Sequence, residues 1–71
     1  MSYLVVVERG DNSFGAYVPD LPGCVAVGDT EEEALRRIQE AIALHIEALK
    51  QQGLPVPEPR SHAELVAAGS P

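Results

Sequence analysis

Pro19-Asp20-Leu21-Pro22-Gly23-Cys24, followed closely by Gly28-Asp29-Thr30-Glu31-Glu32-Glu33-Ala34, is the most informative part of this chain. Proline fixes φ and has no amide hydrogen, so Pro19 is expected to end a strand, and Pro22-Gly23 suits a tight turn. Thr30 and Glu33 form a capping box, in which each side chain accepts a hydrogen bond from the other residue's backbone amide. A strand, a turn, a second short strand and a helix start are therefore predicted in quick succession.

Strands are predicted on both sides of this turn. The β-branched, apolar run Tyr3–Glu8 predicts a first strand, and Gly10–Ser13 has the composition of a turn. Phe14–Val18 predicts a second strand and Cys24–Val27 a third. The links are too short for parallel crossovers, so the three strands should form an antiparallel meander.

A helix is predicted from Thr30 to about Gln52, with Gly53 in position to cap its end. The apolar residues on this segment recur at spacings of three and four, as in an amphipathic helix: Leu35, Ile38, Ile42, Ile46 and Leu49. The alternating prolines of residues 55–59 predict an extended edge strand or a polyproline-like strap. Ser61 and Glu64 predict a second capping box that opens a short helix to about Ala68.

These elements predict an α+β fold, with one long helix packed on one face of a three-stranded antiparallel sheet. Residues 1–71 should form a single domain, with a core in 1–57 and a tail in 58–71 that holds the short helix. No repeat or second domain is visible.

The small size and the apolar pattern predict self-association. A chain of 71 residues with a single cysteine cannot supplement its core with an internal disulfide. Apolar residues also occupy both faces of the predicted strands, while one helix covers only one face. A homo-oligomer, a dimer or a tetramer, is therefore expected. The residues assigned to its interface are Leu4, Val6, Tyr17, Cys24 and Ala26.

The formal net charge of −6 argues against direct binding to nucleic acid, because the five basic residues form no continuous stripe. No segment is long and apolar enough to span a bilayer, and the amino terminus lacks the basic head of a signal peptide. A free cysteine without an export signal is typical of the cytoplasm.

The sequence gives little support to a catalytic or metal site. Four carboxylates, at Glu8, Asp11, Asp20 and Asp29, could hold a divalent ion only if they converged. Cys24 with His45 could form a nucleophile pair, but a free cysteine entering an apolar strand is commonly a small hydrophobe. No catalytic residue, metal or cofactor is therefore expected.

Partner contacts are expected on the loop and on the helix. Leu21 either points outward as a contact or folds back over the helix end, and the sequence leaves both open. Acidic residues on the outer helix face suit a basic partner. The predicted contact residues are Asp20, Leu21, Pro22, Gly23, Glu40 and Glu47.

The order and spacing of these motifs resemble the N-terminal domain of HicB-type antitoxins. The resemblance runs from Tyr3 to about Pro57 and rests on the Pro19–Cys24 and Gly28–Ala34 motifs and on a helix that ends before Gly53-Leu54-Pro55-Val56-Pro57. It implies a partial ribonuclease H-like fold without catalysis, and binding to a HicA-type toxin, a small basic ribonuclease that cleaves messenger RNA. Typical members continue into a DNA-binding domain, which is expected to be missing from this short form.

The resulting hypothesis is an antitoxin-type protein that neutralises such a toxin by covering it. The alternatives are a stand-alone oligomeric structural or regulatory module without a toxin and, third, a metal-dependent nuclease.

Overall fold

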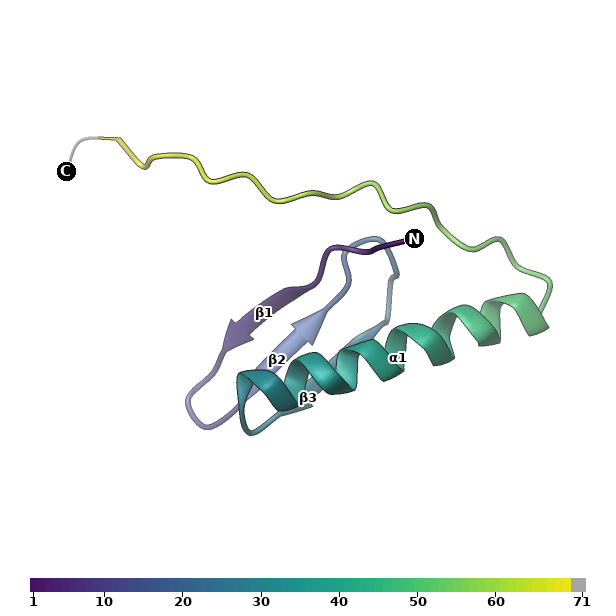
Figure 1. Cartoon of the computed structure of the whole chain (residues 1–71), viewed down its shortest axis with the longest axis horizontal. Coiled ribbons are helices and arrows are strands. Elements are labelled where there is room, and N and C mark those ends of the chain that lie inside the picture. The colour runs from purple at the N-terminus through teal and green to yellow at the C-terminus, as the bar shows by residue number, and fades with distance from the viewer. Residues whose placement is uncertain (70–71) are drawn as a thin grey trace.

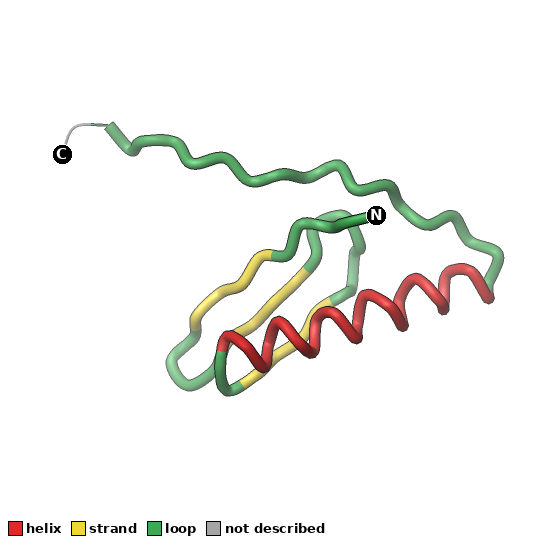
Figure 2. Tube along the Cα trace, in the orientation of Figure 1, coloured by secondary structure: helices red, strands yellow, loops and turns green. Residues whose placement is uncertain are grey.

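The computed structural model describes residues 1–69 and has the predicted α+β architecture (Figure 1). The order along the chain is β1 (Val6–Arg9), β2 (Phe14–Tyr17), β3 (Val25–Gly28) and α1 (Glu31–Gln51). Helix, strands and connecting segments are distinguished by colour in Figure 2. No helix in residues 1–69 combines the length and apolar character needed to cross a membrane.

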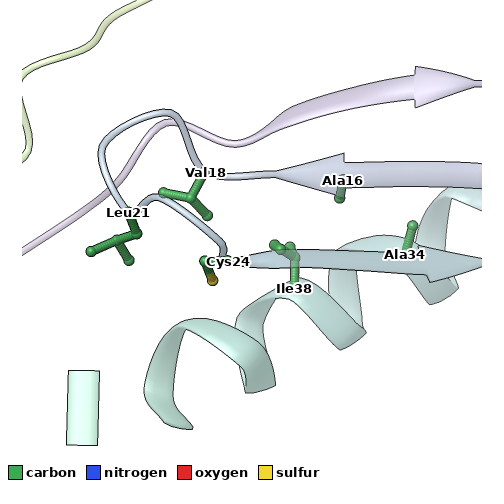
Figure 3. Close-up of a cluster of buried hydrophobic side chains, with 6 residues drawn as sticks. All are labelled: Ala16, Val18, Leu21, Cys24, Ala34 and Ile38. Carbon is green, nitrogen blue, oxygen red and sulfur yellow. The ribbon is translucent and has the colours of Figure 1, made fainter. Parts of the chain in front are cut away.

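The three strands form an antiparallel sheet in the order β1-β2-β3, as the short links predict. Helix α1 packs on one face of this sheet, closest to β3 and β2 (Figure 1). The core between them is small and is built largely from small side chains, which let the helix approach closely. Its buried residues are Ala16, Val18, Leu21, Cys24, Ala34 and Ile38 (Figure 3).

The start of α1 is held tightly against the end of β3. A Cβ atom on Gly28 would lie 2.6 Å from the backbone nitrogen of Ala34, so only glycine allows this approach. Thr30 caps the helix by accepting a hydrogen bond from the Glu33 amide at 3.1 Å. The reciprocal bond differs from the prediction, because the Glu33 carboxylate accepts from the amide of Asp29, at 2.9 Å, rather than from that of Thr30.

The other end of α1 closes as a Schellman motif. The Gly53 amide donates to the Lys50 carbonyl and the Leu54 amide to the Leu49 carbonyl, at 3.1 and 2.9 Å. Gly53 has a φ of 71°, a left-handed conformation that glycine adopts without strain. The predicted helix boundaries and cap are therefore confirmed.

After α1 the chain is extended and runs back past the N-terminus (Figure 1). Residues 54–61, called the strap below, form no ladder with the sheet, so of the two predicted forms the strap is correct. Residues 62–69, to which the name tail is restricted from here on because residues 58–61 belong to the strap, are exposed and point away from the body (Figure 2).

The short helix predicted from Ser61 to Ala68 is wrong, because residues 61–69 contain no helix. Helices of this length are marginal without tertiary packing, and Leu65 is fully exposed, at 103%. The Ser61 hydroxyl and amide are instead engaged by Asp20. The predicted tail ends with Ser70 and Pro71, which lie outside the described residues.

Candidate partner-binding surfaces

The loop between β2 and β3 folds as consecutive tight turns that direct Leu21 inward. The Leu21 amide donates to the Val18 carbonyl at 3.1 Å, and the Cys24 amide donates to the Leu21 carbonyl at 3.0 Å. The Leu21 side chain is 0% exposed and lies at one end of the core (Figure 3). The prediction that Leu21 is a partner contact is therefore wrong, and the alternative, in which it folds back, is what the structure shows.

Asp20, the second predicted contact in this loop, binds the strap of its own chain. One carboxylate oxygen accepts hydrogen bonds from the Arg60 and Ser61 amides, both at 2.8 Å, and the other accepts from the Ser61 hydroxyl at 2.8 Å. The amide bonds from Ser61 and Arg60 lower the pKa of the Asp20 carboxyl below its usual value, because they favour the ionised form. Asp20 is thus a latch for the strap.

A second bond fixes the strap beside the N-terminus. The Tyr3 hydroxyl donates to the Pro57 carbonyl at 2.5 Å. Burial raises the pKa of Tyr3, and the nearby carboxylates of Glu58 and Asp20 raise it further. Sequence reasoning missed both strap contacts, because the first joins residues 54 positions apart and the second residues 40 positions apart. In the loop, Pro22 and Gly23 are exposed and available to a partner.

The outer face of α1 presents an apolar residue among acidic ones. Glu40 and Glu47, both predicted contacts, are exposed. Leu44 lies four residues after the first and three before the second, so all three share one side of the helix. Leu44 is 72% exposed. It went unnoticed in the sequence because it falls outside the apolar spacing of the buried face.

The sheet face turned away from α1, called the open face below, is largely apolar. Paired residues on neighbouring antiparallel strands point to the same side. Val6 pairs with Tyr17, and Tyr17 pairs with Val25, so these residues form a row across the open face. Val27 pairs with Gly15 in the next row, and Leu4 belongs to this face by alternation. Leu4, Val6 and Tyr17 therefore lie where the predicted interface requires.

The two other predicted interface residues are on the wrong face. Cys24 is buried in the core and Ala26, which pairs with Ala16, packs against it on the helix side. Val25 and Val27 occupy the open face in their place. Alternation along a strand shows which of its residues share a face. Which face of one strand lies on the same side of the sheet as a given face of the next depends on the turn between them, and the sequence alone does not determine it.

Neither route to catalysis gains support from the geometry. Cys24 is buried, and this burial raises the pKa of its thiol, which opposes formation of the nucleophilic thiolate. Within residues 1–69, no three histidine, cysteine, aspartate or glutamate side chains gather as a metal site would require.

Comparison with known proteins supplies the family. The model of the HicB-like antitoxin of bacterial toxin–antitoxin systems matches residues 3–70. The chain belongs to this family. A relative, a UPF0150 protein of Synechocystis, is 45% identical over 58 residues, which cover 80% of this chain and 73% of the relative. Another, from Thermoplasma acidophilum, is 40% identical over 67 residues and covers 93% of this chain and 94% of the relative.

Solved structures agree with the HicB-like assignment. The N-terminal domain of the Burkholderia pseudomallei antitoxin HicB matches with a TM-score of 0.73 and 34% identity, over 82% of this chain and 69% of that one. A chain of the HicA3 and HicB3 toxin–antitoxin complex matches with a TM-score of 0.71 and 35% identity, over 83% of this chain and 70% of that one. The fold and the family are thus those that the resemblance predicted.

Proposed function

We propose that this HicB-like chain is an antitoxin that neutralises a small, basic HicA-type ribonuclease by covering it, without catalysis of its own. The observation that carries the proposal is the family membership together with the likeness to a chain of a HicA3–HicB3 toxin–antitoxin complex. The cytoplasm, where such a ribonuclease would meet messenger RNA, is the proposed location.

The outer face of α1 is the proposed contact surface. Glu40 and Glu47 would attract a basic protein and speed its encounter, while Leu44 would be desolvated on contact and lengthen the life of the complex. Pro22 and Gly23 at the loop tip are further candidates. Asp20 and Leu21 are left out of the proposed contact, because the chain itself occupies them.

Affinity capture from native cells, with mass spectrometry of the retained proteins, tests the partner. Recovery of a small basic ribonuclease, followed by loss of its messenger RNA cleavage when this chain is added, would support the proposal. Recovery of this chain alone would favour the stand-alone module. Cleavage of RNA by the purified chain with Mg²⁺ or Mn²⁺ would instead favour the nuclease.

Matched variants then test the surface. The double change Glu40→Lys and Glu47→Lys should weaken toxin binding at least about tenfold, because it places like charges opposite each other. Leu44→Ala should accelerate dissociation. The controls are Glu64→Lys, which makes one such charge reversal in the tail, and Leu65→Ala, which makes the same truncation as Leu44→Ala on an exposed tail residue. Equal effects of test and control variants would rule out the helix face as the contact.

A further inference from the structure

The sheet has two outer edges, and the alternation of its hydrogen bonds shows which backbone groups point out of each. Bonded and non-bonded pairs alternate along an antiparallel ladder. The Gly10 amide donates to the Ser13 carbonyl at 2.8 Å, which makes this a bonded pair. Counting back along the register of β1 and β2, Arg9 and Val7 belong to non-bonded pairs, so their N–H and C=O groups point out of the sheet. The same alternation directs those of Val5 outward.

The outer edge of β3 is covered by the helix of its own chain. The Val18 amide donates to the Cys24 carbonyl at 3.2 Å, so the same count directs the backbone groups of Val25 and Val27 outward. Arg37 of α1 donates to the Val27 carbonyl at 2.8 Å and thereby occupies this edge. Proteins commonly protect their edge strands from further pairing in such ways. The edge of β3 is therefore closed to another strand.

The outer edge of β1 is open. Within residues 1–69, no loop and no side chain forms a hydrogen bond to its outward backbone groups. The strap passes the N-terminus without joining the sheet, and its alternating prolines lack the amide hydrogens that a ladder needs. Half-buried apolar side chains flank this edge, with Val6 on the open face and Val7 on the helix side. Such an edge is a template for an added strand.

The tail is an extended segment that is exposed throughout. Its two large apolar residues, Leu65 and Val66, are 103% and 85% exposed. As neighbours in an extended chain they point to opposite sides, just as Val6 and Val7 do in β1. The tail contains no proline, so each of its residues can donate to a ladder. It therefore matches the open edge in backbone donors and in the placement of its apolar side chains.

The latch at Asp20 directs the tail away from the β1 strand of its own chain. Asp20 holds the Arg60 and Ser61 amides, at 2.8 Å each, at the root of the tail. From there the tail runs outward and diverges from β1 (Figure 1). Two copies with a net charge of −6 repel each other, but residues 65–69 carry no charge and can approach a second copy without adding to this repulsion. The tail is thus placed to reach another molecule.

We propose that two copies of the chain exchange tails, so that each tail adds a strand to the outer edge of β1 in the other copy. Leu65 and Val66 then cover the apolar side chains of β1, one on each side of the sheet. Exchange of an identical element is a low-cost route to a two-fold pair. The contact uses an edge of the sheet and not its open face. It is independent of the proposed antitoxin function and leaves the outer face of α1 free.

Complementation between two defective variants is the sharpest test. Val7→Pro removes an outward amide of β1 at an edge position, where proline is tolerated, and removal of residues 62–71 deletes the tail. By light scattering at high concentration, the full chain should have about twice its monomer mass of 7.6 kDa. Each variant alone should be monomeric, with the dissociation constant raised at least about tenfold. A mixture of the two should form a pair, because one supplies the tail and the other the edge.

Matched variants guard against an indirect effect. Val25→Pro removes an outward amide from β3 and should leave the pair intact, because Arg37 already closes that edge. Val66→Asp charges the exposed tail and should give monomers, whereas Leu44→Asp places the same charge on α1 and should not. Circular dichroism at low concentration checks that each variant is folded. Val66→Asp lies outside the domain, so it keeps the test decisive even if Val7→Pro does not fold.

Hydrogen exchange identifies what occupies the edge. In the pair, the outward amides of Val7 and Arg9 should be protected, and dilution should expose them. The amides of Val6 and Glu8 point toward β2 and should stay protected throughout, which provides an internal reference.

Several outcomes would overturn the exchange. One is a native chain that stays monomeric up to about millimolar concentration, the weak limit of specific association. Another is a pair that survives removal of residues 62–71. Protection of Val7 and Arg9 in the monomer would mean that the tail closes on its own chain, and protection only with a captured toxin would make that protein the occupant. Loss of toxin binding with the pair intact would instead overturn the antitoxin function alone.

Discussion

Leu21 is completely buried although it lies in a turn, and it joins the core at the end where β2 and β3 connect. Its truncation would leave a cavity that the tight turns around it cannot close. We expect Leu21→Ala to cost about 2–5 kcal/mol, close to the whole stability of a domain this small. Urea unfolding, monitored by circular dichroism, measures this change in the free energy of unfolding. Leu65→Ala in the tail is the control and should change stability by less than about 0.5 kcal/mol; an equally small effect at Leu21 would contradict its role.

Asp20 gives the strap a dependence on pH. The pKa of this carboxyl is lower in the folded chain than the ordinary aspartate value of 3.8. The contribution of the Asp20 carboxylate to holding the strap is therefore complete above pH 3.8, and it is lost as the pH falls through the lower pKa of the folded chain. The NMR signals of the Arg60 and Ser61 amides should therefore shift together in acid as the strap is released. Asp20→Asn should release the strap at neutral pH and abolish this transition. Glu58→Gln, a matched change in the strap, should preserve it; persistence of the transition in Asp20→Asn would refute the latch.

At the scale of elements, the approach of α1 to β3 depends on Gly28. Gly28→Ala forces a methyl group against the backbone at Ala34, which cannot rotate away, and should destabilise the chain by about 1–3 kcal/mol. Gly15→Ala adds the same methyl group where there is open space. Measured by urea unfolding at low protein concentration, it should be neutral or slightly stabilising. Equal costs for the two variants would mean that a general glycine effect, and not the close approach, explains the loss.

The sequence predicted those elements whose signals are local. The boundaries of α1 follow from Thr30, Glu33 and Gly53, whose caps involve residues within a few positions. The side of the sheet on which Cys24 and Ala26 lie depends on strand register, and their assignment to the interface was wrong. The helix predicted from Ser61 to Ala68 does not form, because a capping pattern alone provides no surface for a short helix to pack against. Leu44 can be recognised as an exposed apolar residue only once the structure shows which face of α1 is buried.

At the scale of the whole molecule, the strap and the tail should differ sharply in importance. The radius of gyration is 14.2 Å, against about 11 Å for a compact domain of this length, and the extended tail accounts for the excess. A chain ending after Ser61 should keep its stability within about 0.5 kcal/mol and become smaller by X-ray scattering. A chain ending after Gly53 also loses the hydrogen bonds of Tyr3 and Asp20, and the first of these alone should cost about 1 kcal/mol. Equal stability of the two shortened chains would show that the strap, despite its two anchor points, rests on the domain without holding it together.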